Sequence, residues 1–350
     1  MPLIKYQDSN LQPLTLDMIA KANSILDYYA GRGIAVTLRQ LYYRFVALNL
    51  FPRDWADPKT GSTNNIRSYK RLGDMVNKAR LCGLIDWSYL QDNARNLSHR
   101  SHFSSPIDAI DAVTHHYARD LWWGQDNYVE VWVEKDALIS IVQPVCYRWD
   151  VPVLACRGYV SQSEMWGAGQ RYYERMSQAQ SVTIIHLGDH DPSGIDMSRD
   201  IEDRLLMFTG YHTAQELYKS RPQTAAEDRE AWVERLTQLY KARMGKGFKL
   251  DRIALNMDQI QLHNPPPNYA KVTDSRYDGY VREYGEDSWE LDSLEPEVLE
   301  ELLDDSISNY ILDRKLYDEQ IAIQERERDN LKHVSRSWDK IQSLILAGEL

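Results

Sequence analysis

The feature that most constrains the fold is an alternation of β-strand and α-helix patterns in the middle of the chain. Three short apolar runs predict strands, at 128–133, 151–155 and 181–187. Each is followed by a longer segment with helical periodicity, at 136–149, 161–178 and 193–208. Such alternation is typical of βαβ units, whose strands run parallel. The sequence therefore predicts an α/β fold built on a parallel sheet, with a further strand at 248–255.

The first hundred residues have a different pattern. Three helices are predicted, at 15–30, 37–49 and 65–81, and Thr37 is the expected N-cap of the second. The segment 84–97 is predicted to form a hairpin, the wing of a winged helix. Three helices followed by a hairpin are typical of a small DNA-binding module of the helix-turn-helix class.

The charge distribution supports a polyanionic partner for this front part. Residues 1–100 hold 14 Lys and Arg against eight Asp and no Glu, a formal charge of +6. The remaining residues hold 27 basic and 44 acidic side chains, a formal charge of −17. A basic module on an acidic body indicates contact with nucleic acid, although solvated surfaces can show the same asymmetry by chance.

We expect four segments. These are a winged-helix domain at 1–104, a connector at 105–126 that is predicted to be helical over 105–125, an α/β domain at 127–294 with a helical insertion near 211–245, and C-terminal helices at 295–350. The chain has neither a signal-peptide pattern nor an apolar run of about 18 residues, so we expect no membrane contact. Three cysteines without Cys-x-x-Cys spacing fit a reduced, cytoplasmic setting.

Carboxylates follow two of the predicted strands. Glu134 comes directly after the first, and Asp189 and Asp191 come after the third. Because parallel strands end at one edge of a sheet, these acids are expected to converge there. Three carboxylates suit Mg²⁺, which prefers oxygen ligands. The alternative interpretation is structural: Asp191 stands before Pro192, as an N-cap does, and Glu134 or Asp136 could cap the next helix.

The second predicted helix carries a candidate nucleophile. Helical spacing places Tyr42 on the apolar face and Tyr43 away from it, so Tyr43 is expected to be exposed. Arg39 lies one turn earlier, where its guanidinium would favour the phenolate of Tyr43 and could bind a phosphate. The alternative is that Tyr43, one of 22 tyrosines, belongs to a half-buried surface.

The third predicted helix has a basic face. Four cations share it, with Asp74 among them: Arg67, Lys70, Arg71 and Lys78. This pattern fits a helix that lies against a DNA backbone or in a major groove, and it fits a solvated helix face equally well.

Together, these motifs resemble those of the topoisomerase VI A subunit and its relative, the meiotic double-strand-break transesterase. Val133–Ala137 (Val-Glu-Lys-Asp-Ala) and Gly188–Gly194 (Gly-Asp-His-Asp-Pro-Ser-Gly) are similar to the family's toprim motifs. Thr37–Tyr43 (Thr-x-Arg-x-x-Tyr-Tyr) is similar to its nucleophile motif. Shorter likenesses are the Gly-Tyr turn at Gly158-Tyr159 and the stretch Glu290–Leu294.

The resemblance implies a winged helix followed by a toprim domain. It assigns Mg²⁺ to Glu134, Asp189 and Asp191, the reactive phenol to Tyr43 and an assisting role to Arg39. It also implies that a homodimer cuts both strands of DNA, with the tyrosine of one protomer working with the metal site of the other. No Gly-rich Walker loop occurs, so ATP-driven strand passage would need a separate ATPase subunit.

Two rival functions remain open. A toprim nuclease would hydrolyse DNA with water and without Tyr43. The nuclease subunit of the Wadjet plasmid-defence system resembles such a relative. A DNA-binding regulator with a non-catalytic site would not need Glu134.

Overall fold

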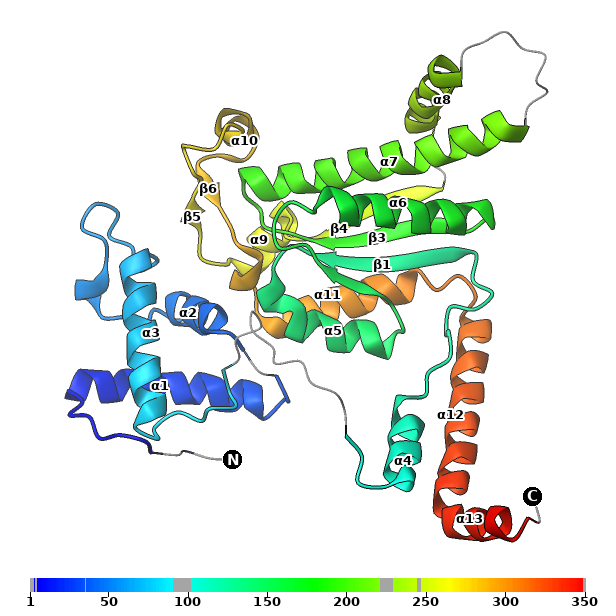
Figure 1. The fold of residues 1–350 in the computed structure, drawn as a ribbon. Helices are drawn as coiled ribbons and strands as arrows, with labels where there is room; N and C mark the ends of the chain where they lie inside the picture. The colour runs from blue at the N-terminus through cyan, green and yellow to red at the C-terminus, as the bar shows by residue number, and fades with distance from the viewer. Residues whose placement is uncertain are drawn as a thin grey trace.

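The computed structural model describes residues 3, 5–34, 36–90, 102–220, 229–243 and 247–348. Its centre is a four-stranded sheet in the order β2-β1-β3-β4 (Figure 1). In chain order the strands are β1 Asn127–Val133, β2 Val153–Ala155, β3 Ser181–Leu187 and β4 Phe248–Ala254. All three strand pairs are parallel, which confirms the predicted α/β class and its parallel sheet.

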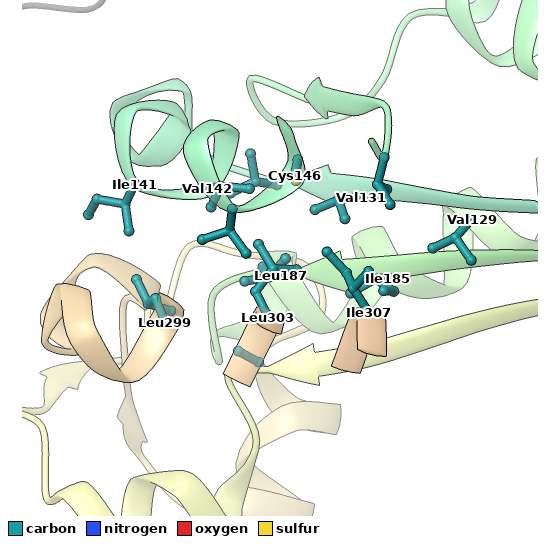
Figure 2. Packing of buried hydrophobic residues seen from close by; sticks show 14 of the residues in the cluster. Val129, Val131, Ile141, Val142, Cys146, Ile185, Leu187, Leu299, Leu303 and Ile307 are labelled. Carbon is teal, nitrogen blue, oxygen red and sulfur yellow. The ribbon is translucent and has the colours of Figure 1, made fainter. Parts of the chain in front are cut away.

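Helices cover both faces of the sheet. Helices α5 (Ile139–Arg148) and α11 (Pro296–Asn309) lie on one face, and α6 (Gln162–Ser177) and α7 (Pro192–Ser220) on the other (Figure 1). Neighbouring residues of a strand serve opposite faces, as the period of two requires. Val131 packs with Ile141 and Leu299 on the first face (Figure 2), whereas Trp132 packs with Met165 on the second. Both faces are thus buried, which explains the continuous apolar runs of the strands.

The N-terminal helices have an apolar cluster of their own. They are α1 (Pro13–Ala30), α2 (Leu38–Ala47) and α3 (Ile66–Leu81), with the short helix η1 (Arg53–Trp55) between α2 and α3. Thr37 begins α2 with a capping box that it forms with Gln40, as its position predicted. Residues 84–90 contain only one isolated bridge, between Val36 and Leu90, and the rest of the expected hairpin, 91–97, lies outside the described residues.

The predicted connector helix is shorter than expected. Helix α4 is Pro106–His116, and residues 117–126 run without a helix to β1. The backbone of that loop bonds to side chains far along the chain: the N–H of Arg119 donates to Gln324 (2.8 Å) and that of Leu121 to Asp150 (2.8 Å). Such long-range partners replace the helical hydrogen bonds that local periodicity predicted.

The remaining elements extend the α/β core. Two helices follow β3, the long α7 and α8 (Arg229–Arg243), so the described part of 211–245 is helical as expected. After β4 come α9 (Met257–His263), β5 (Asn268–Tyr269), α10 (Tyr277–Tyr284), β6 (Asp287–Ser288) and η3 (Leu291–Ser293). Strands β5 and β6 pair antiparallel. The chain ends in α12 (Arg314–Arg336), which packs on α4, and α13 (Trp338–Ala347).

In the described part of the chain, no helix combines the length and the apolar composition needed to cross a bilayer.

Candidate functional site

Glu134 and Asp189 meet at the carboxyl edge of the sheet. Strands β1 and β3 are neighbours, so the residues that follow them lie side by side. The backbone N–H of Asp189 donates a hydrogen bond of 2.8 Å to Oε2 of Glu134, and both side chains are buried. Burial and the charges of Asp189 and Asp191 raise the pKa of Glu134 to about 8. The charges of both aspartates thus act on Glu134.

Asp189 is also held by groups from outside the sheet. Its Oδ1 accepts a hydrogen bond of 2.7 Å from the N–H of Leu291 and lies 2.9 Å from Nζ of Lys135. Burial raises the pKa of Asp189 to about 6, although the ammonium of Lys135 acts in the opposite direction.

Asp191 caps a helix, as the alternative interpretation predicted. Its Oδ1 accepts hydrogen bonds from Oγ of Ser193 (2.9 Å) and from the N–H of Gly194 (2.6 Å), at the start of α7. A Cβ atom on residue 194 would lie 2.2 Å from the carbonyl oxygen of Asp189. The turn that carries both aspartates therefore closes only with glycine at this position.

A buried lysine joins this edge to the segment after β6. Nζ of Lys135 lies 2.9 Å from Asp189, 2.7 Å from Glu290 and 2.9 Å from Asp292. The side chain of Asp292 is fully buried. Lys135 was missed as a site residue by reasoning from the sequence, and its position directly after Glu134 was the available signal.

Arg252 is a second cation that the sequence did not reveal. It lies in β4, and its guanidinium donates to the carbonyl oxygens of Gly188 (3.0 Å) and Asp189 (2.6 Å) and to Oγ of Ser198 (2.7 Å). Burial lowers the pKa of Arg252, while the nearby carboxylates act against that shift. The side chain fixes the turn after β3 through its backbone.

Tyr43 is buried, so the prediction that it is exposed is wrong. Its relative exposure is 3%. Helical spacing accounted only for the face of α2 that meets α1 and α3, whereas α2 also contacts η3. The hydroxyl of Tyr43 accepts a hydrogen bond of 3.3 Å from Nδ2 of Asn268. Tyr42 is buried as expected, and its hydroxyl donates to Oδ1 of Asn64 (2.9 Å).

Arg39 lies near Tyr43 but is shared with two carboxylates. It forms ion pairs with Glu290 and with Asp292, the latter at 3.1 Å. Burial raises the pKa of the Tyr43 phenol, Asp292 and Glu290 raise it further, and Arg39 only partly offsets them. In this arrangement the phenol is therefore protonated, and the expected activation by Arg39 is outweighed.

Tyr43 and Asp191 line the same cavity, which has a volume of about 300 Å³. Residues from α2, the start of α3, β5, β6 and the turn after β3 form its wall: Arg39, Tyr42, Tyr43, Asn64, Asn65, Ile66, Tyr69, Asp191, Asn268, Tyr269, Lys271, Ser288 and Glu290. Glu134 and Asp189 are not part of this wall. The cavity brings the candidate nucleophile to one of the three candidate metal ligands.

The donor chemistry of Glu134, Asp189 and Asp191 fits Mg²⁺ in part. All three offer carboxylate oxygens, which are the ligands that Mg²⁺ prefers, and a divalent cation would offset the negative charge that the two aspartates place near Glu134. However, across the described ranges no three Asp, Glu, His or Cys side chains are gathered closely enough to hold an ion. The cap at Asp191 and the ammonium at Asp189 account for this, since each already engages a carboxylate.

The predicted basic face of α3 reaches solvent. Arg67, Lys70 and Lys78 are exposed, and within the described residues none of the three forms an ion pair. Arg71 is half-buried and stacks over Trp55, with 5.0 Å from its guanidinium carbon to the ring centre. Ile66 and Tyr69 of the same helix line the cavity, whereas none of the four cations does.

Comparison with protein-family models, with curated proteins and with solved structures found no match to this chain.

Proposed function

We propose that this chain cuts double-stranded DNA by Mg²⁺-assisted transesterification through Tyr43, as the topoisomerase VI A subunit does, whose motifs it resembles. The cavity shared by Tyr43 and Asp191 carries the proposal. It joins two motifs that lie about 150 residues apart in the sequence. Arg39, from the same motif as Tyr43, also lines the cavity.

In the proposed reaction, the phenolic oxygen of Tyr43 attacks a phosphorus atom of the DNA backbone. The bond from phosphorus to the 3′ oxygen breaks, leaving a phosphotyrosine at the 5′ end and a 3′ hydroxyl. The phenol loses one proton and the departing oxygen gains one, so the proton balance is unchanged. Arg39 would bind the phosphate after its guanidinium has released Glu290 and Asp292. Mg²⁺ held by Glu134, Asp189 and Asp191 would stabilise negative charge on the phosphate.

The proposal extends to the assembly. A cut through both strands needs two tyrosines, so we propose a homodimer. ATP-driven strand passage would need a separate ATPase subunit, because the sequence holds no Walker loop.

A covalent-trapping experiment tests the proposal. The protein is incubated with supercoiled plasmid and Mg²⁺, stopped with detergent, and analysed with and without protease. We expect linear DNA bound covalently to protein, which Tyr43→Phe abolishes. The matched control is Tyr28→Phe, which removes a hydroxyl from an exposed tyrosine of α1 outside the cavity and leaves the adduct intact. An adduct that survives Tyr43→Phe would contradict the proposal.

Hydrolysis by water is the second candidate. It is favoured by the burial of Tyr43 and its raised pKa, which leave the phenol a poor nucleophile. This candidate predicts cleavage without an adduct, unaffected by Tyr43→Phe and abolished by Glu134→Gln.

A non-catalytic DNA-binding protein is the third candidate. It is favoured by Lys135 and Arg252, because these two cations themselves supply positive charge next to the acids. It predicts that Glu134→Gln leaves DNA binding unchanged. Neither the natural chain nor this variant should then cleave DNA.

A further inference from the structure

The cavity beside Tyr43 has the dimensions of a site for a small ligand. Its volume of about 300 Å³ lies at the lower end for ligand pockets and excludes duplex DNA. One nucleotide is a ligand of suitable size for such a space.

The wall of the cavity is rich in rings. Four tyrosines contribute to it: Tyr42, Tyr43, Tyr69 and Tyr269. Tyr269 is 66% exposed and Ile66 is 68% exposed, so a ring and an aliphatic side chain remain open to solvent on this wall. Nucleic-acid bases stack on such surfaces whatever their identity.

Two cations accompany the rings. Arg39 is engaged by Glu290 and Asp292. Lys271 is exposed and, within the described residues, pairs with no carboxylate, so its ammonium is available to a phosphate.

We propose that the cavity receives one nucleotide that has left the base stack of a DNA strand, its base against the rings of Tyr69 and Tyr269 and its phosphate near Lys271 and Arg39. The inference rests on the proposed function, because it identifies the part of the DNA that would be held beside Tyr43. Unstacking has an energetic cost, which the contacts with the rings offset.

The amide groups of Asn64 and Asn65 in the cavity wall offer little selectivity between the four bases. Nδ2 of Asn64 donates to Pro267 (2.8 Å) and Asn268 (2.8 Å), and its Oδ1 accepts from Tyr42. Nδ2 of Asn65 donates to Trp55 (3.1 Å) and Ser62 (3.0 Å). Because these donors are already used, the edge of a base finds few new partners. The four nucleotides therefore bind with similar affinity, and stacking carries the contact.

Nucleotide binding and photocrosslinking test the inference without reference to cleavage. The probes are the four deoxynucleoside monophosphates, thymidine without phosphate, and a short single strand that carries iododeoxyuridine. We expect the four monophosphates to bind within a few-fold of one another. The crosslink, located by mass spectrometry, falls on Tyr69 or Tyr269.

Two variants separate the base contact from the phosphate contact. Tyr269→Ala weakens binding of every monophosphate about tenfold, the effect of losing one stacked ring. Lys271→Gln weakens the monophosphates and leaves thymidine unchanged. The control is Tyr147→Ala, which removes a tyrosine that is 70% exposed on α5 and is not part of this cavity.

The outcomes distinguish the inference from the proposed function. Equal affinity of Tyr269→Ala and the natural chain, or a crosslink confined to residues outside the cavity, overturns the inference. If an adduct at Tyr43 forms while nucleotides fail to bind, the proposed function stands and the inference fails. If nucleotides bind at the cavity and no adduct forms, the inference stands and the tyrosine mechanism fails.

Discussion

Glu130 is a carboxylate within β1 that is as deeply buried as the apolar residues beside it, which its polar character did not predict. Its relative exposure is 2%, and it accepts hydrogen bonds from Arg171 (3.0 Å), Tyr172 (2.6 Å) and Trp132 (3.0 Å). Burial alone would raise the pKa of Glu130, but these hydrogen bonds outweigh it and lower the pKa below its ordinary value of 4.5. The network ties β1 to α6.

The lowered pKa gives Glu130 a defined effect on acid stability. A carboxylate whose folded pKa is depressed contributes stability that is present above its unfolded pKa and is lost as the pH falls through the folded value. We expect Glu130→Gln to reduce the free energy of unfolding by about 2 kcal/mol near neutral pH, since it weakens the hydrogen bonds that a buried carboxylate accepts. The variant should then lose less stability than the natural chain below pH 4.5.

Urea unfolding across a pH series measures both effects of Glu130→Gln. The matched control is Glu174→Gln, an exposed change on the same helix as Arg171. Identical acid dependence in the natural chain and the Glu130 variant would disprove the assignment.

Gly194 sets a steric prediction at the turn after β3. Adding one methyl group brings Cβ to 2.2 Å from the carbonyl oxygen of Asp189, so the backbone must shift. We expect Gly194→Ala to destabilise the protein by about 2 kcal/mol, the usual order for overpacking.

The comparison for Gly194→Ala is Gly279→Ala, in α10, where a Cβ meets nothing within 4 Å. That change should stabilise the protein by about 0.5 kcal/mol, since alanine restricts the unfolded chain. Thermal unfolding of the two variants gives the answer, and equal effects would count against the steric argument.

Single residues also show where reasoning from the sequence succeeds. Glu134 and Asp189 lie together because parallel strands end at one edge, a rule that depends only on the strand pattern. Lys135 could have been noticed from its place after Glu134, but the contacts of Lys135 and Arg252 could not be foreseen, since their partners come from 188–198 and 290–292, remote in sequence. Tyr43 was misplaced because helical periodicity reports one buried face, and docking on η3 buried another.

At the scale of elements, α2 is attached to the α/β core by ion pairs. Arg39 pairs with Glu290 and Asp292, and Arg44 pairs with Glu295. Arg32, in the turn before α2, pairs with Glu297 at 3.5 Å. Basic residues of the N-terminal part thus meet an acidic segment that runs from the end of β6 into the first turn of α11.

A charge-reversal cycle tests this attachment. Arg44→Glu should loosen α2, and the double variant Arg44→Glu/Glu295→Arg should restore it. The coupling is expected to be about 1 kcal/mol, because Glu295 is half exposed and solvent screens the pair. Hydrogen exchange of the α2 amides reports the loosening. Additive effects of the two single changes would show that the contact contributes nothing.

Strands were easier to predict than connectors. Each strand of the sheet begins and ends within about two residues of its predicted limits, since strands buried on both faces form continuous apolar runs. The connector helix was predicted to reach residue 125, but it ends at His116. The loop that follows it is held by hydrogen bonds to Gln324 and Asp150, and no local sequence pattern reveals such distant partners.

At the scale of the whole molecule, the charge is divided between a basic front and an acidic body. Ion pairs within the protein neutralise part of the basic charge, namely that of Arg39 and Arg44. Arg67, Lys70 and Lys78 of α3 remain outside those contacts and are exposed. Binding to DNA should therefore depend on α3.

The salt dependence of DNA binding measures that contribution. Each cation that neutralises a phosphate releases a counterion, so Arg67→Gln combined with Lys70→Gln should lower the slope of log affinity against log salt by about 2. The control is Lys315→Gln on α12, where the side chain is 88% exposed. An unchanged slope in the α3 double variant would exclude this face from the contact.

The cavity beside Tyr43 has walls from the N-terminal helices and from β5 and β6, so it exists only while these parts are together. By mass action, any compound that fills it favours the joined arrangement over the separated one. A small aromatic compound that fits this space would therefore stabilise the contact between the N-terminal helices and the β5–β6 part. The dependence of its affinity on conditions would report how often the two parts separate.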